Sequence, residues 1–178
     1  MAVTLRQVEA LPATYPATPT GLSVAAVALS AATIWQRIEA YTSVRWTARA
    51  VTWIVEGPGE WVPTLSPATI TTKEQWNGTA WEAFTPSASP MGGYCLDCEK
   101  PYRFAGTVGP GTVPEGVNEA FRRLAEYMAA DQQALGATSE SYNVGPVTVS
   151  TSRSANWAAR ALSNSGAGDL LRPYRGLA

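Results

Sequence analysis

The element that the sequence predicts most clearly begins in the stretch VPEGVNEAFRRLA, residues 113–125. Pro114 suits the first turn of a helix, where a missing N–H costs nothing, and Glu115 lies near the positive end of the helix dipole. The apolar side chains of this region recur at helical spacing and share one face; they are Val117, Phe121, Leu124 and Met128. We therefore predict a helix over residues 114–135, with Gly136 as its C-terminal cap.

A second helix is predicted upstream of it. Ser30 can cap a helix that runs to about Ser43, and the apolar side chains fall on one face of that helix. These side chains are Ile34, Trp35, Ile38 and Tyr41. We expect this face to be buried in a core.

The region between the two helices favours a small antiparallel β unit. Residues 44–56 are rich in Trp and Val, which is typical of a strand. Residues 68–84 predict a hairpin, because the pair Asn77-Gly78 favours a type I′ turn. Trp76 and Trp81 flank this turn and could pair across the strands. Residues 93–108 predict a second hairpin.

The two ends of the chain differ from this middle part. Residues 1–28 contain three prolines and no apolar stripe, so we expect an extended N-terminal arm, with a disordered terminus as the alternative. Residues 29–140 form the predicted core. Residues 141–178 form a tail with a strand over 147–151 and a short helix over 154–162.

Together these elements predict an α+β fold with two principal helices and short C-terminal helices. An antiparallel β-hairpin unit lies between the two principal helices, and both termini are extended.

The composition excludes several classes of function. The chain has 178 residues, a net charge of −1 and no histidine. Without histidine there is no Ser-His-Asp triad and no imidazole metal ligand. We therefore expect no enzyme, no catalytic residues and no cofactor. Charged residues make up 15% of the chain, against about 25% in an average protein, so part of the surface is expected to be covered by other chains.

The sequence also argues against some partners and compartments. No apolar run reaches the roughly 18 residues of a membrane span, and the N-terminus does not have the pattern of a signal peptide. The near-neutral balance disfavours coating of nucleic acid, which needs a basic surface. Two cysteines do not make a disulfide framework, which is consistent with a reducing compartment.

The spacing Cys95-x-x-Cys98 is the one metal-like pattern of the sequence. A structural zinc site needs four ligands, and the chain offers no further Cys or His. We favour two thiols or a local crosslink, and we predict no metal site. The neighbouring Asp97 and Glu99 are expected at a solvated tip.

Two further features leave alternatives open. Trp76 and Trp81 could form a sugar-stacking platform, although packing in a core or an interface is favoured. The tail carries four arginines against Asp169, a local net charge of +3. It could contact DNA phosphates, but its apolar residues favour docking into a groove of a protein.

Three stretches, taken in order, resemble a known family. They are Ile38-Glu39-Ala40-Tyr41-Thr42 at a helix end, Val113-Pro114 at a helix start, and the closing Leu170-Leu171-Arg172-Pro173-Tyr174-Arg175. This arrangement is similar to the head–tail connector, or adaptor, proteins of long-tailed bacteriophages and gene transfer agents. The resemblance covers about residues 29–135 and the last ten residues. Residues 1–28, in place of a charged helix, and the Ser-rich residues 141–168 depart from the family pattern.

The resemblance implies a structural virion protein without enzymatic activity. It also implies a fold that is mainly α, a small helical bundle with an inserted antiparallel β-hairpin unit. Such adaptors assemble as a ring, typically of twelve copies, beneath the portal, at the neck of the virion. The ring extends the channel for packaged DNA, which it lines without specific binding, and presents a surface to a stopper or tail protein. Assembly takes place in the host cytoplasm and involves no membrane.

The resemblance also assigns a docking segment. The portal-docking residues that it implies are Leu170, Leu171, Arg172, Pro173, Tyr174 and Arg175. The alternatives are a tail-completion or terminator component of the same particle, or a carbohydrate-binding β module that uses Trp76 and Trp81.

Overall fold

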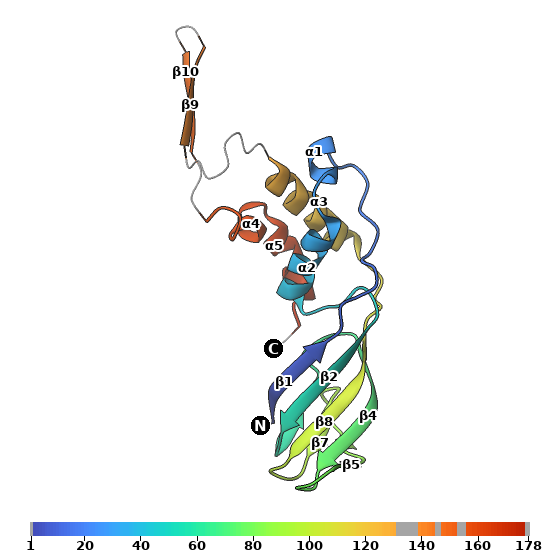
Figure 1. Cartoon of the computed structure of the whole chain (residues 1–178). Helices are drawn as coiled ribbons and strands as arrows, with labels where there is room; N and C mark the ends of the chain where they lie inside the picture. The colour runs from blue at the N-terminus through green and yellow to red at the C-terminus, as the bar shows by residue number, and fades with distance from the viewer. Residues whose placement is uncertain (1, 131–138, 145–146, 153–155, 177–178) are drawn as a thin grey trace. The chain divides into compact units, whose positions relative to one another are not determined.

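A computed structural model of the chain describes most of its residues (Figure 1). The residues that it does not describe are 1, 131–138, 145–146, 153–155 and 177–178.

The chain divides into two compact units, each built from segments far apart in the sequence. The first, here called the sheet unit, consists of Met1–Pro16, Thr42–Val113 and Tyr174–Ala178. The second, the helical unit, consists of Ala17–Tyr41 and Pro114–Pro173.

The sheet unit is built on a five-stranded antiparallel sheet with the strand order β1-β2-β8-β4-β5. In chain order its strands are β1 (Val3–Glu9), β2 (Arg49–Glu56), β4 (Ala68–Trp76), β5 (Trp81–Ala83) and β8 (Pro101–Val108). A three-stranded sheet of order β3-β7-β6 accompanies it. Its strands are β3 (Gly59–Trp61), β6 (Ser87–Ala88) and β7 (Tyr94–Leu96).

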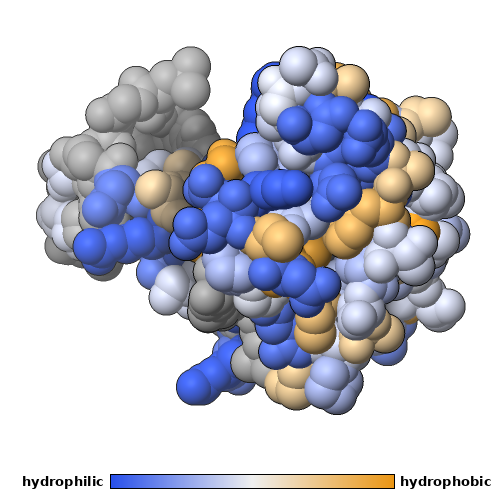
Figure 2. All heavy atoms as spheres, turned by 90° about the horizontal axis from the view of Figure 1, so that it is seen from below, coloured by the Kyte–Doolittle hydropathy of each residue, from blue (hydrophilic) through white to orange (hydrophobic). Residues whose placement is uncertain are grey.

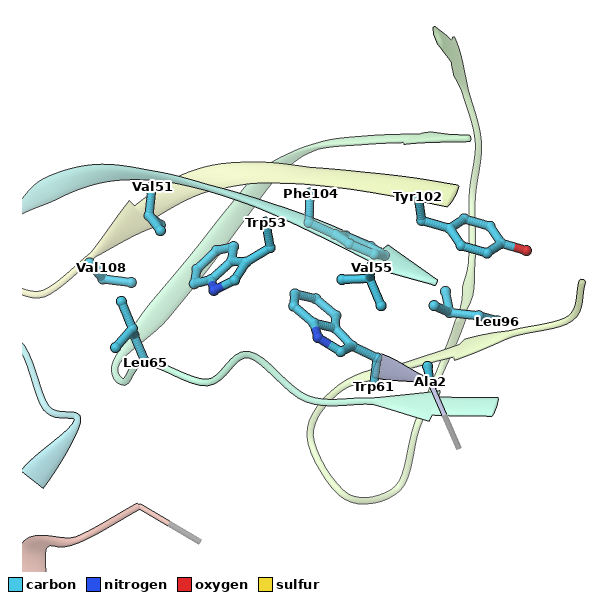
Figure 3. Close-up of a cluster of buried hydrophobic side chains, with 10 residues drawn as sticks. All are labelled: Ala2, Val51, Trp53, Val55, Trp61, Leu65, Leu96, Tyr102, Phe104 and Val108. Carbon is cyan, nitrogen blue, oxygen red and sulfur yellow. The ribbon is translucent and has the colours of Figure 1, made fainter. Parts of the chain in front are cut away.

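Alternation along the strands creates the core of the sheet unit. In β2, Val51, Trp53 and Val55 are buried, whereas the two residues between them are only partly buried. Figure 3 shows these side chains on one side of the sheet, together with Trp61 and Phe104. The rings of Trp61 and Phe104 stack with centroids 4.4 Å apart. Large aromatic rings therefore supply much of the apolar area that stabilises this unit.

The described residues of the helical unit form five short or medium helices. They are α1 (Val24–Val27), α2 (Ala31–Thr42), α3 (Glu115–Ala129), α4 (Ala161–Asn164) and α5 (Ala167–Leu171), followed by a 3-10 turn, η1 (Arg172–Tyr174). Trp35 of α2 packs against Phe121 of α3, with ring centroids 5.0 Å apart. The unit also contains the two-stranded antiparallel pair β9 (Ser139–Val144) and β10 (Val147–Ser152).

The predicted fold class is wrong, because the chain is rich in β structure rather than mainly α. Strands account for 32% of the chain and helices for 28%, and two antiparallel sheets of five and three strands replace the predicted bundle with its inserted hairpins. A main reason is β1, which lies in the region predicted to be an extended arm and pairs with β2. Its alternation is inverted, since polar Thr4 and Gln7 face the core while Val8 is exposed.

The predicted hairpin over 68–84 is confirmed as β4 and β5, but its turn differs from the prediction. Trp76 pairs with Trp81, which leaves four residues in the loop. Asn77 accepts hydrogen bonds on its side-chain oxygen from the N–H groups of Thr79 and Ala80, and only Gly78 has a positive φ, of +107°. A type I′ turn needs two such residues and a two-residue loop.

The predicted hairpin over 93–108 is wrong. β7 pairs with β3 and β6, whereas β8 pairs with β2 and β4. The two segments are adjacent in sequence, but they belong to different sheets.

The helix predictions hold with changed ends. The predicted helix from Ser30 to Ser43 is α2, and that over 114–135 is α3, which ends at Ala129 because Ala130 has an extended ψ of 131°. Gly136 lies outside the described residues. The predicted strand over 147–151 is β10.

The helix predicted over 154–162 begins later than expected, at Ala161. Residues 156–160 form turns, and positions 154 and 155 lie outside the described part of the chain.

Candidate functional site

The C-terminal segment, defined as residues 170–175, is anchored by one buried leucine. Leu171 ends α5 and has none of its surface exposed. The preceding Leu170 is half-buried, whereas the following Arg172 and Pro173 are exposed. Leu171 thus fixes the start of the segment in the helical unit and places a basic, rigid dipeptide at the surface.

Three sequence segments converge on this anchor within the helical unit. Near the end of α2, the Tyr41 hydroxyl donates a hydrogen bond to the carbonyl oxygen of Gly168 in α5, at 3.2 Å. α5 itself packs against α3. Arg37 of α2 donates a hydrogen bond to the carbonyl oxygen of Ala158 at 2.9 Å. This bond connects α2 to the residues that precede α4. The helices α2, α3 and α5, which carry most of the three family-like stretches, are therefore parts of one packed unit.

The last residues of the segment belong to the sheet unit. Tyr174 is half-buried there, with its ring edge-on to Trp46 at a centroid distance of 6.5 Å. The N–H of Gly176 donates to the carbonyl oxygen of Thr42 at 3.1 Å. Arg175, between these two contacts, is exposed.

The six predicted docking residues therefore differ in what they can offer to a partner. Arg172, Pro173 and Arg175 are exposed, Leu170 and Tyr174 are half-buried, and Leu171 is buried. The leucine pair was expected to anchor the tail in a partner. Leu171 instead contributes to the packing of this chain, so a partner that meets the segment in this conformation contacts a basic surface.

A buried charge cluster that the sequence analysis missed lies at the end of β1. Glu9 accepts hydrogen bonds from the guanidinium groups of Arg45, at 2.5 and 2.9 Å, and of Arg49, at 3.1 Å. Arg49 also lies 5.8 Å from the ring centroid of Tyr15. Burial raises the pKa of Glu9, but the hydrogen bonds and charges of the two arginines outweigh it, so the pKa is lowered overall. This cluster binds the N-terminal strand to the start of β2.

Trp76 and Trp81 do meet across the hairpin, as predicted. Their ring centroids are 5.3 Å apart, and their planes are inclined by 60°. The guanidinium of Arg103 lies 4.8 Å from the centroid of Trp81 and bonds Glu74 at 2.5 Å. The hydrogen bond from Arg103 lowers the pKa of Glu74. One face of Trp81 is thus occupied by the protein itself, and the arrangement is explained by packing on the sheet.

The cysteines are free thiols at one end of the sheet unit. Cys95 is half-buried in β7 and Cys98 is exposed. The Tyr102 hydroxyl donates to the carbonyl oxygen of Cys98 at 3.2 Å and accepts from its N–H at the same distance. Burial raises the pKa of Tyr102. Within the described part of the chain, no three acidic, Cys or His side chains gather in a way that could hold a metal ion.

Figure 2 shows one face, seen from below the view of Figure 1, on which hydrophobic areas are interspersed with hydrophilic residues. None of the helices in the described ranges is long and apolar enough to cross a membrane.

Comparisons with known proteins give no name to this arrangement. No family model, no curated protein and no solved structure matches the chain.

Proposed function

We propose that the protein is a structural component of a virus particle, a head-to-tail connector that forms a ring beneath the portal. The observation that carries this proposal is that α2, α3 and α5, which carry most of the three family-like stretches, pack together in the helical unit. Tyr41 and Gly168 are 127 positions apart in the sequence, yet they share a hydrogen bond. The helices that carry most of the family-like stretches thus belong to one structural unit.

The proposal rests on the helical unit and not on the sheet unit. The resemblance implied a mainly helical fold, and the five-stranded sheet departs from it. In the sequence, β1 of the sheet unit precedes α2, and the other strands of this unit lie between α2 and α3. None of these strands carries a family-like stretch. In the proposed connector it is an addition to the helical unit that enlarges the surface available to neighbouring copies.

Portal docking is assigned to the exposed part of the C-terminal segment. Arg172, Pro173 and Arg175 present two positive charges and a rigid ring on a short segment that Leu171 fixes at its start. Such a segment is suited to a groove that contains carboxylates, because guanidinium groups bind carboxylates in a bidentate geometry. Fixing the segment before binding also lowers the entropy cost of docking.

The charge balance supports a wall around a DNA channel. A net charge of −1 avoids the tight phosphate binding that would slow the passage of DNA. The proposed ring, of twelve copies, lies at the neck of the virion, joins the capsid to a stopper or tail protein and assembles in the host cytoplasm. It needs no catalytic residues and no cofactor.

Electron microscopy of the full chain mixed with the purified portal protein of the same particle tests this function. The proposal predicts an additional ring of density on one end of the portal. If the chain does not bind the portal but binds the end of the purified tail, it is instead a tail-completion or terminator component. A chain that binds neither assembly contradicts a role in the neck.

A further inference from the structure

The five-stranded sheet ends in two open edges. β1 pairs with β2 on one side only, and among the described residues no strand lies on its other side. At the opposite edge, β5 pairs with only the last three residues of β4. The N–H of Phe84 also bonds the carbonyl oxygen of Lys73, which leaves residues 68–72 of β4 open on the side away from β8.

β1 lacks most of the features that protect an edge strand. It is seven residues long and contains no proline, and Val3, Leu5 and Val8 are 57, 56 and 49% exposed. Natural edge strands usually avoid exposed apolar side chains, because open N–H and C=O groups pair readily with another strand. Arg6 is the one exposed charge of β1. This edge is therefore suited to pairing with a further strand.

Hydrogen bonds at the strand ends show which backbone groups are available on each edge. The N–H of Ala10 bonds the carbonyl oxygen of Ala50, and antiparallel ladders alternate, so the backbone groups of Gln7 and Glu9 point away from β2. On the opposite edge, the carbonyl oxygen of Pro67 accepts from Gly109. The same alternation directs the backbone groups of residues 68 and 70 away from β8.

The two edges fit each other in direction, length and register. β1 and β4 run in opposite directions in the sheet, since each pairing between them is antiparallel. A register that places Gln7 opposite Ile70 and Glu9 opposite Ala68 joins the available backbone groups of both edges. It also places Val8 opposite Thr69 on the outer face of the joined sheet. Side chains on the outer face of one copy therefore lie beside side chains on the outer face of the next copy, and the same holds for the core face.

Irregularities in the two strands also correspond. β1 has a register shift between Thr4 and Arg6, and β4 has one between Ile70 and Thr72. In the register described above, these two bulges lie at the same level and compensate each other. The charges are compatible as well, because Arg6 falls opposite Thr71 and no like charges oppose.

We propose that β1 of one copy pairs antiparallel with residues 68–72 of β4 in the next copy, so that the sheets of successive copies join edge to edge. The contact is heterologous, and repetition of it generates a closed ring or an open filament. The register follows from the sheet alone. A second copy as the partner agrees with the ring of the proposed function. The pairing itself does not require that the chain binds a portal.

Charged substitutions at the outer-face pair, Val8 and Thr69, test the proposal. Val8→Lys combined with Thr69→Lys places like charges opposite each other, whereas Val8→Lys with Thr69→Glu places opposite charges there. We expect sedimentation of the full chain to show that self-association weakens by about ten-fold or more in the first variant and returns in the second. The control, Val62→Lys with Thr107→Lys, makes the same substitutions away from both edges, at a valine of similar exposure (44%), and should associate like the wild type.

Cysteine crosslinking tests the register itself. In a chain with Cys95→Ser and Cys98→Ser, the pair Val8→Cys and Thr69→Cys should give a ladder of covalent oligomers on oxidation, and each single variant should give none. Dimers of the Val8→Cys variant alone would show that two β1 strands pair with each other and would overturn the proposal. A wild-type chain that stays monomeric at about 100 μM, well above a typical micromolar Kd, would also overturn it. Portal binding that persists in either case leaves the proposed function standing.

Discussion

The hydroxyl of Tyr41 donates a hydrogen bond to the carbonyl oxygen of Gly168 across 3.2 Å. Tyr41 is near the end of α2, and Gly168 lies in α5, three residues before the buried Leu171. This bond joins the second predicted helix to α5, whose last residues begin the C-terminal segment. It links the family-like stretch at the end of α2 to the helix that leads into the closing stretch.

Removing this hydroxyl should weaken the helical unit. Tyr41→Phe removes the hydroxyl that donates to the carbonyl oxygen of Gly168. Because this hydrogen bond is lost, the free energy of unfolding should fall by about 1 kcal/mol. Urea denaturation measures the effect. Tyr94→Phe is the control, because the Tyr94 hydroxyl makes no hydrogen bond with the described residues, and its effect should be close to zero. Equal effects of the two substitutions would show that the bond does not contribute.

Leu171 should be essential for folding of the helical unit. Leu171→Ala removes a fully buried side chain, and we expect a loss of about 2–5 kcal/mol in unfolding free energy. Leu170→Ala, at the neighbouring half-buried position, should cost less than half as much. A truncation after Gly168 removes Leu171 and is therefore expected to unfold this unit together with any docking. Comparable costs for the two leucines would contradict the assigned anchor.

The cluster of Glu9, Arg45 and Arg49 predicts a dependence of stability on pH. Because the folded-state pKa of Glu9 is lowered, its stabilising contribution is fully present above the unfolded pKa of about 4.3 and is lost as the pH falls through the folded value. Glu9→Gln should cost about 1–3 kcal/mol at pH 7, because it removes charged hydrogen bonds.

Denaturation of the wild type and of Glu9→Gln at a series of pH values tests this prediction. The difference in unfolding free energy between the wild type and Glu9→Gln should shrink as the pH is lowered from about 5 toward 3. Glu60→Gln, at an exposed position of β3, should give a small difference that changes little with pH. A Glu9→Gln difference that is constant across the series would contradict the lowered pKa.

The contact between Arg103 and Trp81 should be measurable as a coupling energy. The guanidinium lies 4.8 Å from the ring centroid and is only partly exposed, so we expect a coupling of about 0.5–1 kcal/mol. A double-mutant cycle with Arg103→Gln and Trp81→Leu gives this value from four denaturation curves. A coupling of zero would leave Trp81 available for stacking with a ligand and would revive the carbohydrate alternative.

The elements best predicted from the sequence were those with a clear local pattern, either apolar residues at helical spacing or a turn signal between two strands. Phe121 and Leu124 recur at helical spacing, and α3 buries both of them. Trp76 and Trp81 flank a recognisable turn signal, and they pair as expected. In these cases the local pattern and the burial in the fold agree.

The parts that were missed depend on partners distant in sequence. β1 places Thr4 and Gln7 toward the core, where they bond the indole N–H groups of Trp61 and Trp53, so its apolar residues are outside and no strand pattern is visible. The burial of Leu171 likewise depends on α3, which is far from it in sequence. Such contacts are set by tertiary packing, which a local pattern does not contain.

The central claim is that the exposed basic part of the C-terminal segment docks on the portal. The most direct measurement is the affinity of the full chain for the purified portal protein, compared between Arg172→Glu and Arg160→Glu. Both residues are exposed arginines of the helical unit, and both substitutions make the same change in charge. We predict that Arg172→Glu weakens binding at least ten-fold, that is by about 1.4 kcal/mol, while Arg160→Glu leaves it unchanged. Equal affinities for the two variants, both folded as judged by denaturation, would contradict the claim.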